Sequence, residues 1–174
     1  MSFSRRALIG GALALGTLGL VRSGRGAAPG KGKRFEVEKT DAEWKALLSP
    51  AAYDVLRKEG TERAGTSPLD KQHGAGIFHC AGCGQPLFDA GTKFNSGTGW
   101  PSFWAPLDNA VETVTDRSFF MSRTEVHCRR CGGHLGHVFE DGPKPTGLRY
   151  CMNGVSLEFQ PGETAPDANK PDKP

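Results

Sequence analysis

Two short cysteine pairs constrain the fold of this chain more than any other feature. Both have the form Cys-x-x-Cys-Gly, and 44 residues lie between them: Cys80 with Cys83, and Cys128 with Cys131. Two such turns supply four thiolates, which is the number that closes a tetrahedron around Zn²⁺. Because four protein ligands leave no open coordination position, we predict a structural zinc site at these cysteines.

Two other interpretations of the pairs remain open. A disulfide within each pair would suit an oxidising compartment, but it would close a small, strained loop. A redox pair of the thioredoxin type would open a helix after a strand, and neither pair is followed by a helical pattern. Structural zinc is therefore the better interpretation.

The fifth cysteine, Cys151, lies outside the two pairs, in the run Arg149-Tyr-Cys-Met-Asn153. In a strand, alternate side chains share a face, so Arg149, Cys151 and Asn153 would lie together. A thiol between a cation and an amide is a candidate nucleophile with a lowered pKa. The alternative is a buried, inert thiol, and the polar neighbours favour the nucleophile.

Two histidines, His134 and His137, follow the second cysteine pair. They fit three roles: acid/base catalysis, zinc binding, or packing in the core. With four cysteines already available to the metal, proton transfer is the better interpretation.

Aromatic residues gather in the turn Gly97–Trp104, which contains Trp100 and Phe103. The default interpretation is hydrophobic packing. The alternative is a small aromatic pocket for a methyl sulfide, because thioether and methyl groups pack well on aromatic rings. On that interpretation we predict Trp100 and Phe103 as substrate-binding residues.

Composition and charge narrow the class of protein. The chain of 174 residues has 24 glycines and 12 prolines, which favours turn-rich, mainly β structure. Residues 1–34 carry seven Lys or Arg and no acid, whereas residues 35–174 carry 15 basic and 19 acidic side chains. The body of the chain therefore lacks the basic surface that nucleic-acid binding demands.

The N-terminus has the pattern of an export segment. Basic residues at Met1–Arg6 precede the uncharged apolar run Ala7–Val21, which is short for a membrane span. The pair Arg5-Arg6 before a glycine-containing run resembles a twin-arginine signal, which predicts an exported, periplasmic protein. A Sec signal and an uncleaved membrane anchor are the alternatives.

The remaining patterns predict two short helices followed by short strands. The helices are expected over Asp41–Leu48 and from Pro50 to Arg57, with Trp44, Leu47 and Leu48 forming the apolar stripe of the first and Gly60 capping the second. Residues 61–76 read as a loop, and residues 161–174 as a tail without fixed structure. The expected strands are Ile77–His79, Val111–Thr115, Ser118–Val126, His137–Phe139, Arg149–Met152 and Val155–Phe159.

Several separate motifs together resemble one family over residues 35–159, the methionine-R-sulfoxide reductase B family. The resemblance implies a tent-like, mainly β fold with two antiparallel sheets, short N-terminal helices and a structural zinc. It makes residues 35–160 a catalytic domain, which follows the export segment and linker predicted for residues 1–34. The matching segments are Gly60-Thr61-Glu62, Cys80-x-x-Cys83-Gly84, Lys93-Phe94, Gly99-Trp100-Pro101-Ser102-Phe103, Arg123-Thr124-Glu125-Val126, Cys128-x-x-Cys131-Gly132, His134-Leu135-Gly136-His137-Val138-Phe139, Asp141-Gly142-Pro143 and Arg149-Tyr150-Cys151-x-Asn153.

The resemblance also implies roles for individual residues. Cys151 would attack the sulfur of methionine-R-sulfoxide in oxidised proteins, and a histidine would give the oxygen a proton, leaving methionine and a sulfenic acid. The implied assignments are the nucleophile Cys151, the polar residues His134, His137 and Asn153 around the oxygen, Arg149 tuning the thiolate, Asp141 near the histidines, and Trp100 holding the methyl group.

The chain departs from many members of the family at Thr98, where they carry a second, resolving cysteine. With four cysteines on zinc and one at the reacting centre, none remains for that role. We therefore expect an external thiol, such as a thioredoxin-like protein, to reduce the sulfenic acid. Two rival functions are a zinc-ribbon binding module without catalysis and a cysteine-based thiol peroxidase.

Overall fold

The structure is a computed structural model that describes residues 34–116 and 123–162. The predicted export segment up to residue 33 and the predicted tail from residue 163 lie outside the described residues. Within the described ranges, no helix combines the length and apolar character that crossing a bilayer requires.

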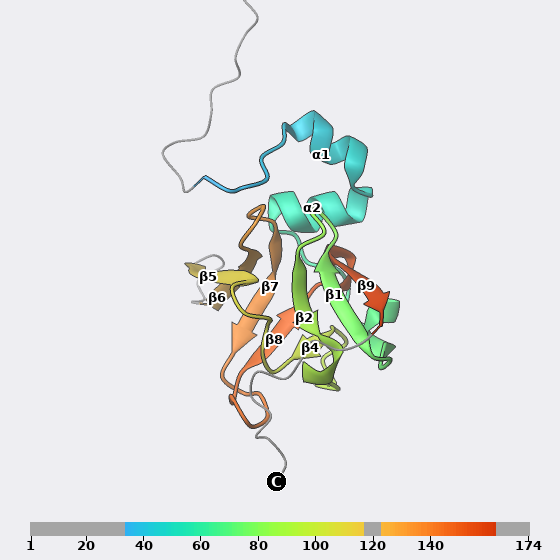
Figure 1. Cartoon of the computed structure of the whole chain (residues 1–174), viewed down its shortest axis with the longest axis vertical. Coiled ribbons are helices and arrows are strands. Elements are labelled where there is room, and N and C mark those ends of the chain that lie inside the picture. The colour runs from blue at the N-terminus through green and yellow to red at the C-terminus, as the bar shows by residue number, and fades with distance from the viewer. Residues whose placement is uncertain (1–33, 117–122, 163–174) are drawn as a thin grey trace, which may run out of the picture. The chain divides into compact units, whose positions relative to one another are not determined.

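Two short helices open the described chain (Figure 1). Helix α1 spans Asp41–Leu47, and the Thr40 side chain caps it in a reciprocal capping box with Glu43. Helix α2 spans Pro50–Lys58 after the Ser49 cap. Two details of the prediction were wrong: Glu59, not Gly60, is the left-handed C-cap of α2, and Leu47 is 55% exposed rather than part of the apolar stripe.

Two antiparallel sheets follow the helices. The smaller has the strand order β2-β1-β9, and the larger has the order β3-β4-β8-β7-β6-β5. The strands are β1 (Gly76–Cys80), β2 (Pro86–Asp89), β3 (Lys93–Phe94), β4 (Ser102–Phe103), β5 (Val111–Asp116), β6 (Arg123–Cys128), β7 (His134–Phe139), β8 (Arg149–Met152) and β9 (Leu157–Pro161). This confirms the predicted mainly β class with two antiparallel sheets.

Most predicted strands are present, but their bounds changed. Strand β7 begins at His134, three residues before the predicted start, and β9 begins at Leu157 because the short 3-10 helix η4 (Gly154–Ser156) occupies the start of the predicted strand. The first part of the predicted strand Ser118–Val126 lies in the undescribed residues 117–122. The predicted loop 61–76 contains the 3-10 turn η1 (Pro68–Lys71).

Strands β2, β3 and β4 were missed. Strands β3 and β4 have only two residues each, which is too short for an alternating pattern to be visible. Strand β2 has four residues and ends where the 3-10 turn η2 (Ala90–Thr92) begins, so it too is short.

The core lies between the two sheets and under the helices. Phe78 of β1, Phe88 of β2 and Phe103 of β4 are fully buried. The Phe88 and Phe103 rings stack at 4.4 Å, and the Phe78 ring meets the Phe103 ring edge-on at 5.0 Å between centroids. These rings join the smaller sheet to the larger one, so the strand that carries Cys151 rests on a packed interior.

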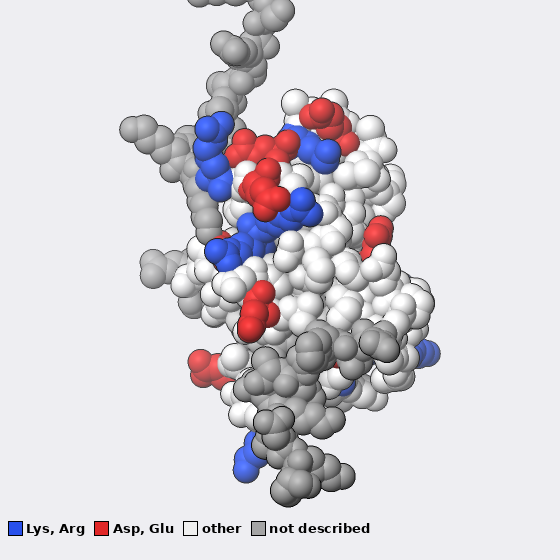
Figure 2. All heavy atoms as spheres, viewed as in Figure 1, with Lys and Arg blue, Asp and Glu red and all other residues white. Residues whose placement is uncertain are grey.

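Charges of both signs are interleaved on the face drawn in Figure 2. The Arg130 guanidinium lies 3.0 Å from the Glu36 carboxylate, and that of Arg129 lies 3.6 Å from the Glu112 carboxylate. Positive charge at these two arginines is therefore balanced locally.

Candidate active site and metal centre

The two cysteine pairs meet in space, as predicted. The four sulfur atoms all lie within 4.8 Å of one another. The Cys80 and Cys131 sulfurs are 3.7 Å apart, and those of Cys83 and Cys128 are 3.6 Å apart. A tetrahedral zinc with Zn–S bonds of about 2.3 Å requires sulfurs about 3.8 Å apart, so the cluster fits one Zn²⁺. All five cysteines of the chain are described and none forms a disulfide in the structure. The sulfurs of both pairs meet in one cluster, which favours a shared metal over a disulfide within each pair.

The metal centre is built at the ends of two strands. Cys80 ends β1 and Cys128 ends β6. In each turn, the glycine after the second cysteine has a positive φ and donates its N–H to the carbonyl of the first cysteine, at 2.8 Å. Helix α2 covers this end, where the Arg57 guanidinium donates to the Cys131 carbonyl. One zinc ion held by four cysteine thiolates therefore joins the two sheets near the helices.

Cys151 lies near the middle of the larger sheet, on β8 between β4 and β7. Its partners in the strand register are Ser102 on β4 and His137 on β7. These three residues are far apart in the sequence, and only the strand order brings them side by side. Gly136 allows the close approach of β7, because a Cβ there would lie 2.1 Å from the Cys151 carbonyl oxygen.

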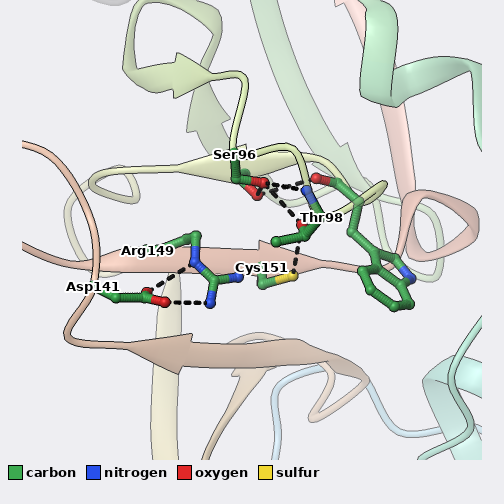
Figure 3. Close-up of polar contacts among 7 residues, drawn as sticks. Ser96, Thr98, Asp141, Arg149 and Cys151 are labelled. Atoms are coloured by element: carbon green, nitrogen blue, oxygen red, sulfur yellow. Dashed lines mark hydrogen bonds and ion pairs between the residues drawn. The ribbon is translucent and has the colours of Figure 1, made fainter. Parts of the chain in front are cut away.

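Hydroxyl groups surround the Cys151 sulfur on one side (Figure 3). The Thr98 hydroxyl lies 3.9 Å from the sulfur. The Ser96 hydroxyl contacts both the Thr98 hydroxyl at 2.8 Å and the Ser102 hydroxyl at 2.7 Å. The residue at the position of the family's resolving cysteine therefore touches the thiol that such a cysteine would have to reach.

Arg149 is held by two contacts near the thiol. Its Nε and Nη2 donate to the two carboxylate oxygens of Asp141, each at 2.8 Å (Figure 3). Its guanidinium also lies over the Phe139 ring, 4.4 Å from the centroid. The ion pair raises the pKa of Arg149 and lowers that of Asp141. The structure thus brings Asp141 to Arg149.

Burial raises the pKa of Cys151 above its ordinary value of 9.0. The Thr98 hydroxyl, the Arg149 charge and the Ser102 hydroxyl act in the opposite direction, but their sum is smaller than the cost of burying a thiolate. The expectation of a lowered pKa was therefore wrong. The sequence shows the cation beside the thiol, but it does not show how far the thiol is removed from water.

A pocket of about 130 Å³ opens in front of Cys151. Four of the predicted residues meet in it: Trp100, His137, Cys151 and Asn153. It has room for a side-chain terminus rather than for a large ligand. Trp100 supplies an apolar wall, while His137 and Asn153 supply polar groups, so the pocket combines a methyl-binding surface with groups able to contact an oxygen.

His134 lies behind this pocket rather than in its wall. It is 3% exposed, its Nδ1 lies 2.8 Å from the Glu125 carboxylate, and its ring meets the His137 ring edge-on at 5.3 Å. Its Nε2 is buried without a hydrogen-bond partner among the described residues. The hydrogen bond from His134 lowers the pKa of Glu125. His134 therefore stands next to His137, oriented by a carboxylate.

Phe103 is not in the pocket. It is fully buried between Phe78 and Phe88, so its prediction as a substrate-binding residue was wrong. The reason is alternation along β4: Ser102 pairs with Cys151 and its hydroxyl joins the network beside the sulfur, which turns the next side chain into the core.

Other residues of the site were missed. Arg123 lines the pocket, and Glu62, Ser96, Ser102 and Glu125 bond to residues that form it or stand beside it. All five belong to loops or short strands far from Cys151 in the sequence. Four of the five stand inside the motifs quoted above, and that was the available signal; Ser96 lies outside them.

These features define a class of protein: a mainly β domain with a four-cysteine zinc site and, apart from it, a cysteine thiol in a small pocket lined by an indole and an imidazole. The SelR domain model matches residues 48–161, about two thirds of the chain, and the chain belongs to this family.

Several proteins named peptide methionine sulfoxide reductase MsrB are similar to the chain. The protein from Leptospira interrogans is 54% identical over 127 residues, which cover 72% of this chain and 97% of that protein. The protein from Pseudomonas syringae is 56% identical over 127 residues, with the same coverage of 72% and 97%. The protein from Methanosarcina barkeri is 55% identical over 128 residues, which cover 73% and 90%.

Proposed function

We propose that the chain reduces the R epimer of methionine sulfoxide in oxidised proteins to methionine, with Cys151 as the nucleophile. The observation that carries the proposal is the pocket of about 130 Å³, which Cys151 lines together with Trp100, His137 and Asn153. Such a pocket suits a group with a methyl on one side of a sulfur and an oxygen on the other. The similarity to the proteins named peptide methionine sulfoxide reductase supports the same activity.

In the proposed reaction, the Cys151 thiolate attacks the sulfoxide sulfur and the S–O bond of the substrate breaks. His137 gives a proton to the departing oxygen, which otherwise leaves poorly. Asn153 donates a hydrogen bond to that oxygen, and Trp100 holds the methyl group. The oxygen then bonds to the Cys151 sulfur as the bond between the two sulfurs breaks, so methionine is released and Cys151 becomes a sulfenic acid.

The remaining polar residues assist this step. His134, oriented by Glu125, supports His137 in the proton transfer. Arg149, held by Asp141, contributes positive charge that favours the thiolate. Zinc takes no part in the reaction and holds the ends of β1 and β6 together when bound.

An external thiol completes the cycle in this proposal. Thr98 occupies the position of a resolving cysteine, and its hydroxyl cannot form a disulfide. The donor thiol attacks the sulfenic sulfur, which releases water and forms a mixed disulfide; a second donor thiol then restores Cys151. A thioredoxin-like protein is the donor class we favour.

The test compares purified wild-type protein with Cys151→Ser on peptides containing methionine-R-sulfoxide, on the S epimer and on peroxide. We expect reduction of the R epimer alone, and its loss in the variant. Undiminished reduction by Cys151→Ser would rule out Cys151 as the nucleophile. Absence of reduction by the wild type would support the non-catalytic module, and a preference for peroxide would support the thiol peroxidase.

The proposed location is the periplasm, reached through a twin-arginine signal in residues 1–34. The supporting features are Arg5 and Arg6 before the apolar run Ala7–Val21. Fusing residues 1–34 to a reporter tests this, with both arginines changed to lysine as the comparison. A twin-arginine signal loses export in the changed fusion, whereas a Sec signal keeps it, and a reporter retained in the membrane would indicate an anchor.

A further inference from the structure

Glu62 connects two walls of the substrate pocket, although it does not line that pocket itself. It lies in the loop between α2 and η1 and bonds through both its side chain and its backbone. Its partners come from two distant parts of the chain: Trp100, and the segment Asn153–Val155 that directly follows the Cys151 strand.

The Glu62 carboxylate holds the backbone that follows β8. Its Oε1 accepts the N–H of Gly154 at 2.5 Å, and its Oε2 accepts the N–H of Val155 at 3.0 Å. Hydrogen bonds to a carboxylate are stronger than those between neutral groups. Gly154 also packs closely against this loop, because a Cβ there would lie 1.9 Å from the Ser67 hydroxyl. The carboxylate thus fixes the turn that directly follows the strand of the thiol.

The Glu62 backbone N–H sets the orientation of the Asn153 amide. It donates to Asn153 Oδ1 at 3.0 Å, and Asn153 Nδ2 donates to the Leu135 carbonyl at 3.1 Å. A backbone N–H needs an acceptor and a carbonyl needs a donor, so the two partners together allow only this orientation. The Leu135 carbonyl uses one of the two Nδ2 hydrogens, so the second remains a donor of the kind that a sulfoxide oxygen could accept.

The Glu62 carbonyl sets the position of the indole. Trp100 Nε1 donates to it at 3.2 Å. The Trp100 indole and the Asn153 amide are therefore both hydrogen-bonded to the backbone of Glu62, and the distance between them depends on the position of that backbone.

We propose that Glu62 is a positioning residue for sulfoxide reduction: it fixes the positions of Asn153 and Trp100 relative to Cys151. This inference rests on the proposed function. Glu62 acts through the two pocket residues and does not touch the substrate, since Thr61 and not Glu62 lines the pocket of about 130 Å³.

The first test measures kcat and KM with a methionine-R-sulfoxide peptide for Glu62→Ala and Glu62→Gln. Glu62→Ala removes the two carboxylate bonds to Gly154 and Val155 and so releases the backbone of residue 62, which contacts Asn153 and Trp100. We expect kcat/KM to fall by roughly tenfold or more, because a small displacement of these two pocket residues is costly in rate. Glu62→Gln should lie between it and the wild type, since its amide oxygen keeps one of the two bonds. The matched control is Glu158→Ala, an exposed glutamate near the same loop, which should behave as wild type.

A second measurement separates positioning from a general loss of structure. The alkylation rate of Cys151 should stay within about twofold of wild type in both Glu62 variants. The pKa of Cys151 depends on its burial and on Thr98, Arg149 and Ser102, and Glu62 is not among the groups that shift it. Zinc content of one per chain verifies the fold. If Glu62→Ala binds less zinc than that, Glu62→Gln carries the same comparison.

A double-mutant cycle of Glu62→Ala with Asn153→Ala tests whether Glu62 acts through Asn153. If Glu62 acts through Asn153, the losses in kcat/KM do not multiply in the double variant. Independent, multiplying losses would overturn the inference, as would wild-type kcat/KM in the Glu62 variants while Asn153→Ala is impaired. Wild-type protein that alkylates normally but reduces no sulfoxide would instead overturn the proposed function.

Discussion

At the scale of single residues, the reactivity of Cys151 is a balance between burial and polar contacts. Burial raises its pKa, while Thr98, Arg149 and Ser102 lower it by less. The free protein therefore holds mostly thiol at neutral pH, and the attacking thiolate must form as the proton leaves during the reaction.

The first prediction concerns this balance. The rate of Cys151 alkylation should keep rising with pH beyond 9.0, because a raised pKa moves the conversion of thiol to thiolate to higher pH. Arg149→Met removes one of the groups that favour the thiolate and should shift the profile further upward. Mass spectrometry of the Cys151 peptide across a pH series measures both rates.

The control for this prediction is Arg129→Met, a change to a half-exposed arginine beside Glu112. Its profile should match the wild type. A wild-type profile that reaches its plateau near neutral pH would contradict the raised pKa.

The second prediction concerns Thr98. Because its hydroxyl lies 3.9 Å from the Cys151 sulfur, Thr98→Cys should form a disulfide with Cys151 during sulfoxide turnover. Mass spectrometry without reductant should detect this link in the variant, whereas wild-type Cys151 should be trapped as a sulfenic acid by a dione reagent. An internal Cys151 disulfide in turning-over wild-type protein would refute the external-thiol proposal.

At the scale of elements, β4 carries two functions on two faces. Ser102 turns toward Cys151, and Phe103 turns into the core between the sheets. The short strand β4 therefore determines both the position of the hydroxyl groups beside the Cys151 sulfur and the packing between the two sheets.

The third prediction separates these two faces. Phe103→Leu should lower the free energy of unfolding by about 1 kcal/mol, because the buried ring is replaced by a smaller side chain, and should leave KM nearly unchanged. Urea unfolding and steady-state kinetics measure the two effects. Val114→Ala, at an exposed position on β5, is the control and should alter neither. A raised KM without loss of stability would contradict this prediction and indicate that Phe103 contributes to substrate binding.

At the scale of the whole molecule, the zinc site joins the ends of β1 in one sheet and β6 in the other. Without the metal, four mostly buried sulfurs would lie against one another at that junction. The metal therefore contributes to folding rather than to the reaction.

The fourth prediction follows from this role. Cys83→Ser, or removal of the metal by a strong chelator, should lower the melting temperature by at least about 10 °C, because zinc binding to such a site contributes several kcal/mol of folding free energy. Circular dichroism and metal analysis provide the measurement. A metal-free protein that melts at the wild-type temperature would contradict the structural role.

The sequence alone determined the features that depend on residue type and short spacing. The two Cys-x-x-Cys-Gly turns identified the metal ligands, and counting cysteines singled out Cys151. Alternation in β8 placed Arg149 and Cys151 on one face, and the capping pattern located α1 and α2. These features are local, so they can be read along the chain without knowing which elements meet.

Only the tertiary structure decided which distant groups surround the thiol and how they act on it. The order of β4, β8 and β7 brought Ser102 and His137 to Cys151, and the loop containing Glu62 came to lie against both Asn153 and Trp100. Burial of Cys151 reversed the expected direction of its pKa shift. The physical reason is that desolvation and cross-strand contacts are properties of the packed environment, which the local pattern of residues does not contain.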